Sequence, residues 1–346
     1  MFSTSFCKSA GPFLSAWLIL GSLVLGCGAP PPEPAVVPGP PASREDLARH
    51  YAPIINQAAA SDQDYITAVD FDGDWIGNNN WENQPAGDLS AHVYYSVIET
   101  QTHWYVFYSL FHPRDYTHNP CEESDGCHEN DLESLEVVAA KDDTVFGRPI
   151  ALLTLAHSHI HLYNYDPAVK AGALTLEGQA RLEEGHPVVW VEAFGHGIYG
   201  KPRVLWPARL IYRFRDRVIY RVGDQADLPE GLRDEDVRYQ LVPIYDTLWQ
   251  HRSELGPGRL FDRPFDYRGR ILPATIDGDN WAPDKANTPW GYNQEIGETL
   301  LRGDFFLNPA KAFAYFATVE GGLVRQYLDN PYLVDIGYVL GMDTGD

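Results

Sequence analysis

Residues His92–Thr100 read His-Val-Tyr-Tyr-Ser-Val-Ile-Glu-Thr, and residues His103–Phe111 read His-Trp-Tyr-Val-Phe-Tyr-Ser-Leu-Phe. Both runs are rich in aromatic and β-branched residues, which favour strands. Only Gln101 and Thr102 separate the two runs, so the stretch predicts a β-hairpin, although neither turn residue favours the positive φ of the commonest two-residue turns. This hairpin is where we expect a β-rich fold to be organised.

Further short apolar runs follow the hairpin and predict more strands. Many short antiparallel strands in about 300 residues favour a sandwich over a parallel α/β sheet. We therefore expect a mainly β fold, an antiparallel β-sandwich with one or two peripheral helices. The predicted strands are Leu132–Ala140, Ile150–His161, Pro187–Ala193, Val204–Tyr212 and Val218–Val222.

Two segments carry helix start signals. Ser43 is followed three residues later by Asp46, which is close to a capping box. Asn308 and Pro309 suit the N-cap and the first helical position. The inward stripe of this second helix would consist of Phe313, Phe316 and Ala317.

The N-terminal segment predicts export and lipid anchoring. Residues 1–26 carry Lys8 as their only charge, and their apolar stretch is too short for a membrane span, as in a secretory signal. The run Val24-Leu-Gly-Cys27 resembles the lipobox of bacterial lipoproteins, which implies cleavage before Cys27 and a lipid on its sulfur. Residues 27–42 would form a Pro-rich linker, and residues 43–346 a single β-rich domain anchored to the bacterial cell envelope.

Cysteine usage fits an oxidising compartment. Of the four cysteines, Cys7 would leave with the signal and Cys27 would carry lipid. Cys121 and Cys127 remain as an even pair, which predicts a disulfide in an exported protein. Two free thiols are the alternative.

The charge balance limits the partners. The chain has 26 Lys and Arg against 48 Asp and Glu, a formal net charge of −22. Nucleic acid and anionic membrane surfaces are poor partners for such a protein, so the expected membrane association is through the lipid alone. Cations are better partners.

The segment Cys121–Glu133 holds the densest potential chemistry, with His128, Asp131 and Glu133 spaced as H-x-x-D-x-E. On a strand, Asp131 and Glu133 would share a face with their Cα atoms about 7 Å apart, within reach of one cation. His128 would reach in from a loop closed by the disulfide. The alternative is the solvated face of an antiparallel strand.

Other histidines are candidate ligands. His157, His159 and His161 alternate on one predicted strand face, and His157 is the expected ligand. The three together would not bind one ion, because their Cα atoms would span roughly 13 Å. A partly exposed strand face with polar residues is the alternative. His196 lies between Gly195 and Gly197. These glycines would allow the backbone to approach a ligand closely.

A second cation loop is a weaker hypothesis. Asp70, Asp72 and Asp74 have the spacing of the first ligands of a calcium loop, but Trp75 and Trp81 stand where an EF-hand needs Gly and Glu. A polar turn packed by these tryptophans is the alternative. The run Asp277-Gly-Asp-Asn-Trp281 echoes this stretch, although Asp-Gly is common turn chemistry.

Two blocks of sequence resemble known families. His128–Glu133 resembles the His-Glu-Gly-Asp-Trp-Glu run of the vacuolar-sorting protein sixty-two-related family, and His186–Tyr199 resembles a later run of that family. The H-x-x-D-x-E spacing is also similar to a motif of necrosis- and ethylene-inducing proteins. That resemblance implies a β-sandwich that binds a divalent cation through His128, Asp131 and Glu133. Leu132 departs from both families, which have Trp there.

Three functions follow as hypotheses. The first is a bacterial surface lipoprotein whose β-sandwich binds a divalent cation and recognises a glycan or a lipid head group. The second is a metal-dependent hydrolase of phosphoesters, lipids or glycans, with Glu129 or Glu192 as general base. The third is a structural envelope lipoprotein. Magnesium, calcium, manganese and zinc all suit a donor set of His and carboxylates.

Overall fold

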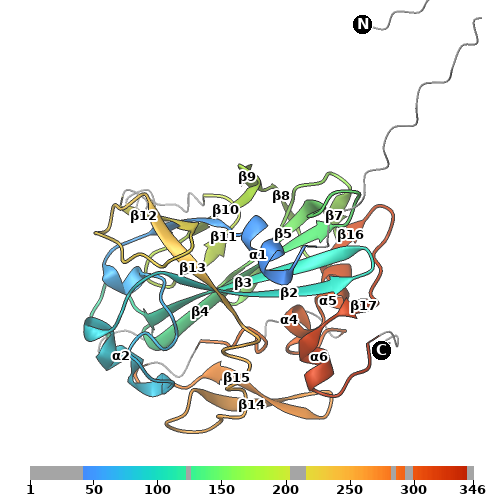
Figure 1. The fold of residues 1–346 in the computed structure, drawn as a ribbon. Helices are drawn as coiled ribbons and strands as arrows, with labels where there is room; N and C mark the ends of the chain where they lie inside the picture. The colour runs from blue at the N-terminus through green and yellow to red at the C-terminus, as the bar shows by residue number, and fades with distance from the viewer. Residues whose placement is uncertain (1–41, 122–125, 203–215, 282–285, 293–298, 341–346) are drawn as a thin grey trace, which may run out of the picture. The chain divides into compact units, whose positions relative to one another are not determined.

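A long antiparallel hairpin forms the middle of the fold (Figure 1). The predicted hairpin is confirmed as β2 (His92–Thr100) and β3 (His103–Asp115), and β3 runs four residues beyond the predicted end. β4 (His128–Ala140) pairs with β3 along its length. The computed structural model describes residues 42–121, 126–202, 216–281, 286–292 and 299–340, and every structural statement below refers to these.

The strands are more numerous than predicted, and most belong to one sheet of 13 strands. Its main path runs β11-β10-β1-β12-β13-β2-β3-β4-β5-β6-β8, with β9 on β10 and β17 on β2. The remaining strands are β1 (Ile54–Ala58), β5 (Arg148–Ala156), β6 (His159–Asn164), β7 (Val169–Ala171), β8 (Leu176–Gln179), β9 (Arg181–Glu183), β10 (His186–Val191), β11 (Ile198–Tyr199), β12 (Arg217–Val222), β13 (Val237–Pro243), β14 (Phe261–Tyr267), β15 (Arg270–Ile276), β16 (Ala317–Val319) and β17 (Tyr327–Asp329).

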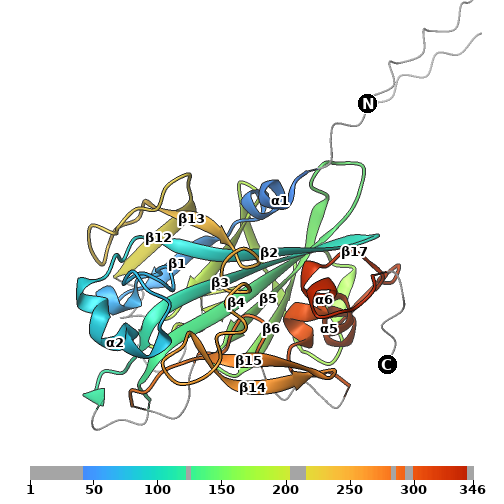
Figure 2. The ribbon, with the colours of Figure 1, turned by 60° about the horizontal axis from the view of Figure 1, so that its bottom comes forward.

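The sheet is two-layered, as the sandwich prediction requires, but a single sheet supplies both layers. One core joins the inward side chains of β2–β5 to those of β1, β10, β12 and β13, for example Val97, Val137, Val189 and Tyr220. Figure 2 shows the β1, β12 and β13 region lying over the central strands. The prediction of a mainly β fold is confirmed. The prediction of purely antiparallel pairing is wrong, because β1·β10, β12·β13, β13·β2 and β6·β8 are parallel.

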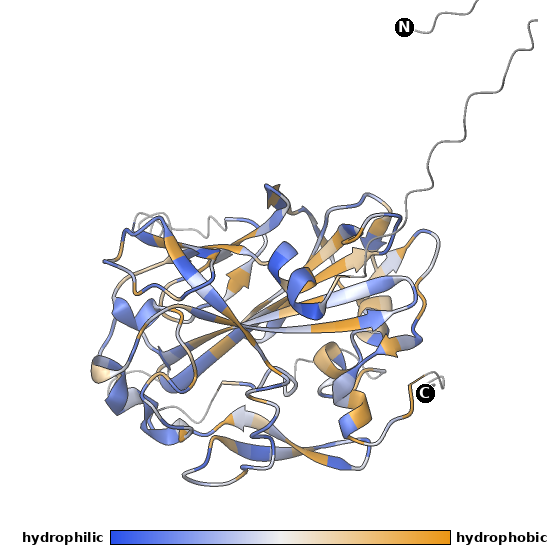
Figure 3. Ribbon diagram, in the orientation of Figure 1, coloured by the Kyte–Doolittle hydropathy of each residue, from blue (hydrophilic) through white to orange (hydrophobic). Residues whose placement is uncertain are grey.

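The other face of the central strands carries a second core. The β14–β15 hairpin and three short helices cover this face, which explains why β2–β5 are apolar on both sides (Figure 3). The described residues contain five α-helices rather than the one or two expected. They are α1 (Arg44–His50), α2 (Asn80–Asn83), α4 (Asp304–Leu307), α5 (Pro309–Phe316) and α6 (Pro331–Asp335), with 3₁₀ turns η1 (Asp62–Asp64), η2 (Gly77–Asn79) and η3 (Gln84–Ala86).

Both predicted helix starts are confirmed. Ser43 and Asp46 form a capping box at the start of α1. α5 begins at Pro309, but the Asn308 side chain makes no cap hydrogen bond and instead accepts a hydrogen bond from Tyr327 Oη at 2.6 Å. Phe313 is fully buried, and its ring packs against Tyr105 of the sheet at 6.4 Å.

One predicted strand is wrong in its extent. Ile150–His161 is two strands, β5 and β6, joined by a tight turn at His157 and Ser158. His157 has a φ of 58°, so the chain reverses there and the three histidines do not share one strand face. Val218–Val222 is confirmed within β12, whereas the predicted strand Val204–Tyr212 lies outside the described residues.

Residues 41–346 form one compact unit. No helix within the described ranges is long and apolar enough to cross a membrane.

We predict that replacing Phe313 by Ala lowers the free energy of unfolding by about 3–5 kcal/mol, because a fully buried ring between α5 and the sheet is lost. Tyr315→Ala on the same helix is the control, since this side chain is only partly buried and should cost about 1 kcal/mol. Urea denaturation measures both. Equal losses of unfolding free energy in the two variants would contradict the packing of Phe313 between α5 and the sheet.

Candidate metal centre

The start of β4 brings the candidate residues together through one left-handed residue. Asn130 has a φ of 60°, which interrupts the alternation of side chains along the strand. His128 is the pairing partner of Asp115 on β3 and contacts it at 3.4 Å between Nε2 and Oδ2, and the charge of Asp131 acts on both residues. Burial opposes the charge of His128, but Asp115 outweighs it and raises the pKa of His128 to about 9.

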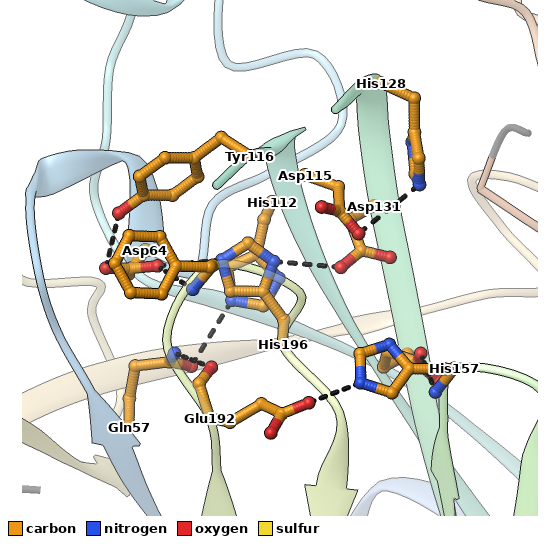
Figure 4. Close-up of polar contacts among 12 residues, drawn as sticks. Gln57, Asp64, His112, Asp115, Tyr116, His128, Asp131, His157, Glu192 and His196 are labelled. Atoms are coloured by element: carbon orange, nitrogen blue, oxygen red, sulfur yellow. Dashed lines mark hydrogen bonds and ion pairs between the residues drawn. The ribbon is translucent and has the colours of Figure 1, made fainter. Parts of the chain in front are cut away.

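His196 is the centre of a fully buried ion network (Figure 4). Its Nδ1–H donates to Asp131 Oδ2 at 2.8 Å and its Nε2–H donates to Asp64 Oδ1 at 3.1 Å. Burial alone would lower the pKa of His196, but the hydrogen bonds and charges of the two carboxylates raise it to about 10. His196 is therefore an imidazolium at neutral pH, held between two carboxylates.

The glycine residues on either side of His196 are required by close packing. A Cβ at Gly197 would lie 2.9 Å from Glu192 Oε1, and a Cβ at Gly195 would lie 2.8 Å from His157 Cε1. The sequence predicted that these glycines allow a close approach, and the structure shows what approaches them. Two further candidate residues, Glu192 and His157, are thus packed around the His196 loop.

Asp64 anchors the other side of the imidazolium. It ends η1 and accepts hydrogen bonds from five groups, which are His196 Nε2, Tyr116 Oη and the backbone N–H groups of Ala60, Ser61 and Phe194. Burial opposes its charge, but these donors outweigh the burial and hold the pKa of Asp64 below its ordinary value. Asp64 is thus a satisfied, permanently charged partner of His196.

His112 stacks on His196 with ring centroids 3.7 Å apart and planes 6° apart. Burial and the charge of His196 hold the pKa of His112 well below its ordinary value, so His112 is neutral. Its Nε2–H donates to Gln57 Oε1 at 3.3 Å, which places the lone pair on Nδ1. That Nδ1 is buried and has no hydrogen-bond partner among the described residues.

Three more acidic and basic groups border the network. His157 N–H donates to Glu133 Oε1 at 2.7 Å, and the His157 ring pairs with Glu192 Oε1, which raises the pKa of His157. Burial, followed by the charge of Asp131, raises the pKa of Glu133 well above its ordinary value, and the charges of Asp115 and Glu192 add to this shift. Asp115, Asp131 and Glu192 each pair with a histidine, whereas buried Glu133 is held toward its neutral form.

One group among the described residues can hold a metal ion with three ligand atoms within 4.8 Å of one another, and it consists of His112, Asp131 and His196. Imidazole nitrogens and a carboxylate are donor types that divalent metals accept. The unpartnered His112 Nδ1 offers a lone pair in the correct tautomer, and Asp131 offers a carboxylate. His196 would have to release a proton to ligate, because both of its ring nitrogens donate to carboxylates.

The sequence therefore identified part of this centre. Asp131 and His196 belong to the three-residue group, whereas His128, Glu133 and His157 lie around it and contact Asp115 or one another. His112, Asp64 and Asp115 were missed. His112 could have been found by extending the predicted strand, because it is two residues beyond Leu110 on the same face and pairs with Asp131. Asp64 and Asp115 gave no such periodic signal.

Glu129 lies away from the metal centre. Its Oε1 accepts a hydrogen bond from Trp81 N at 2.7 Å, and its Oε2 accepts one from Asp279 N at 3.1 Å. Neighbouring Asn130 donates to the carbonyls of Gly77 and Asp277 at 2.8 and 2.7 Å. The segment after the first Asp-Gly run, at Gly77 and Trp81, and the second Asp-Gly run are thus bound to the same two residues of β4.

The hypothesised second cation loop is a hydrogen-bonded turn. Asp72 accepts from Asp74 N and Asn83 Nδ2, and Asp74 accepts from Ile76 N and Asn79 Nδ2. Asp70, Asp72 and Asp74 do not form a metal-ligand group among the described residues. The predicted disulfide between Cys121 and Cys127 is confirmed, and it ends immediately before His128.

Comparisons with known proteins give weak similarities. No family model matches the chain, and no curated protein matches it. Necrosis and Ethylene inducing Protein 2, from the causal agent of cocoa's witches' broom disease, is 18% identical over 46% of this chain and 71% of that chain, with a TM-score of 0.32. NLPPya in complex with glucosamine is 20% identical over 47% of this chain and 70% of that chain, with a TM-score of 0.30.

NLPPya in complex with mannosamine is 18% identical over 47% and 70% of the two chains, with a TM-score of 0.29. These proteins are of the kind whose motif the H-x-x-D-x-E spacing resembles. Likenesses with TM-scores near 0.3 carry no argument about this chain, so its function is argued from its own residues. The resemblance to the vacuolar-sorting protein sixty-two-related family has no support from these comparisons.

The ion network predicts a pH dependence of stability. The pKa of His196 is about 10 in the folded protein and about 6.5 when unfolded, so its contribution is complete below pH 6.5 and is lost as pH rises toward 10. In metal-free protein we expect urea midpoints to fall between pH 6.5 and 10. The His196→Gln variant should be less stable at pH 6.5 and show a flatter profile, whereas parallel profiles would contradict a buried imidazolium.

The side-chain hydrogen bonds and the left-handed backbone of Asn130 predict different losses of stability for two substitutions. Asn130→Gly removes three side-chain hydrogen bonds and should lower the free energy of unfolding by about 2–4 kcal/mol. Asn130→Ala should cost about 1–2 kcal/mol more, because Ala must adopt the φ of 60° that Gly adopts freely. Chemical denaturation of the two variants separates these effects, and an Ala variant as stable as the Gly variant would contradict the left-handed geometry.

Proposed function

We propose that this chain is an exported, lipid-anchored surface protein whose β-rich domain binds a divalent cation and uses that site to recognise a glycan. The observation that carries the proposal is the fully buried, unpartnered Nδ1 of His112 beside Asp131 and His196. A buried lone pair without a donor is costly unless a ligand completes it. A cation would satisfy this atom.

The contacts that orient the two imidazole rings support the same proposal. Asp64 and Gln57 fix the two imidazole rings through their outer nitrogens, at 3.1 Å and 3.3 Å. Metal-binding histidines are commonly oriented in this way by a carboxylate or carbonyl oxygen. The carboxylates of Asp115 and Glu133 lie close enough to act electrostatically on the same region, and they add oxygen donors at the border of the site.

Binding is favoured over hydrolysis by what the two candidate bases contact. Glu129 uses both carboxylate oxygens to hold backbone N–H groups, and Glu192 pairs with the His157 ring. A general base must reach the proton it abstracts with an available lone pair, in the right protonation state. A metal-dependent hydrolase in which Glu192 leaves His157 is the alternative function, and a purely structural role for the network is the second alternative.

A glycan is the proposed ligand because of the net charge of the chain and the proposed anchor. A protein of net charge −22 repels anionic lipid head groups, whereas neutral and basic sugars meet no such barrier. The proposed anchor is Cys27, with residues 27–42 as a spacer, which would hold residues 43–346 outside the membrane to meet an extracellular sugar.

Cation binding is tested by titration calorimetry and elemental analysis of the purified chain with Mg²⁺, Ca²⁺, Mn²⁺ and Zn²⁺. We expect one equivalent of one of these ions in the native protein, with a higher melting temperature in its presence. Asp131→Asn should weaken that binding by about 100-fold or more, because it removes a central ligand.

The matched control is Asp224→Asn, which removes the same charge from a side chain that is 93% exposed. It should bind the ion like the native protein. No binding of any of the four ions, or equal binding by Asp131→Asn, would contradict the proposal and leave the structural role.

A further inference from the structure

Two tryptophans contact each other near the candidate metal centre. Trp81 lies in α2 and Trp281 follows the Asp277 stretch, with ring centroids 5.8 Å apart and planes tilted by 58°. The backbone of Trp281 forms a β-bridge with His128, whose side chain pairs with Asp115. The aromatic pair is therefore next to the border of the metal centre.

The strand that carries the metal candidate Asp131 also fixes this pair. Glu129 binds the backbone of Trp81 and of Asp279, while Asn130 binds Gly77 and Asp277. Neighbouring residues of β4 thus determine where the tryptophan-bearing loops lie. The position of the tryptophans is set by buried side chains rather than by the loops themselves.

The two rings have different roles in this arrangement. The guanidinium of Arg114 lies over the ring of Trp81, 4.5 Å from its centroid, and also donates to the Trp81 carbonyl. Arg114 therefore covers one face of this ring. Trp281 is 43% exposed, although most large apolar side chains of the chain are buried. Trp281 is therefore the ring that is presented to solvent, and Trp81 supports it.

The backbone of Trp281 gives no local reason for a large ring at this position. Its φ is 66°, in the left-handed region that Gly and Asn adopt at lower cost than a bulky residue. One part of the indole contacts Trp81, and the rest is open to solvent. The exposed part of the ring is therefore available to a ligand.

The surroundings of the ring are polar. Asn280 Nδ2 donates to Glu82 Oε1 at 3.0 Å in an exposed position, and Asp279 lies one residue earlier on the same loop. A sugar ring presents C–H groups on one face and hydroxyls around its edge. A flat aromatic surface bordered by amide and carboxylate groups matches both features.

We propose that Trp281, supported by Trp81, is a stacking platform for a pyranose ring of a neutral or basic glycan, next to the cation site. This inference rests on the proposed function and names the part of the site that contacts the sugar face. The acidic rim of Glu82 and Asp279 favours a sugar over an anionic lipid surface, which it would repel.

The platform is tested with glucosamine, mannosamine, N-acetylglucosamine and mannose, by saturation-transfer NMR and calorimetry on the purified chain. Trp281→Ala should weaken the binding of the bound sugars by about tenfold or more, because the stacking surface is lost. Trp281→Phe should stay within about threefold of the native affinity, because it keeps a smaller ring. The cation content of both variants should equal that of the native protein.

The matched control is Leu328→Ala, which removes an exposed apolar side chain, 54% exposed, from β17 and should leave sugar binding unchanged. Native affinity in Trp281→Ala, or no binding of any of the four sugars by the native protein, would overturn the platform. A Trp281→Ala variant that loses binding to vesicles of neutral phosphatidylcholine but keeps sugar binding would also overturn the platform. A cation-free native protein would overturn the proposed function, whereas the sugar comparison between Trp281→Ala and Trp281→Phe decides the platform separately.

Discussion

The placement of His196 between Asp64 and Asp131 is the interaction on which the rest of the site depends. A buried charge is tolerated only when it is paired and hydrogen-bonded, and this one joins a 3₁₀ turn, β4 and the loop after β10. Removing one partner would leave an uncompensated charge in the interior. The network therefore fixes the relative positions of three segments that are distant in sequence.

The same network creates the condition for cation binding. The stacked, neutral His112 keeps an unpartnered nitrogen at the edge of the imidazolium, and acidic groups crowd the other side. In the folded chain the proton on His196 supplies the positive charge that balances Asp131. A divalent cation would compete with that proton, so metal binding and protonation are coupled by the geometry of a single carboxylate.

The first residues of β4 contact two different regions of the fold, because the backbone of Asn130 has a left-handed conformation. On one side, His128 and Asp131 face the metal centre, and on the other side Glu129 and Asn130 bind two polar loops. A regular strand would have placed Glu129 with Asp131. This single irregularity links the cation candidate to the aromatic pair, and it explains why two loops of similar sequence, 200 residues apart, lie at one place.

The sequence alone determined the mainly β class, the central hairpin, the caps of two helices and the Cys121–Cys127 disulfide, because periodicity, capping and turn chemistry are local properties. It also indicated Asp131 and His196. Tertiary structure decided which residues join them, because pairing register places His112 opposite Asp131 and the fold brings Asp64 to His196, 132 residues away in sequence. Whether an acidic side chain faces a cation site or holds a loop, as for Asp131 and Glu129, depends on one backbone angle at Asn130 and on contacts between distant segments.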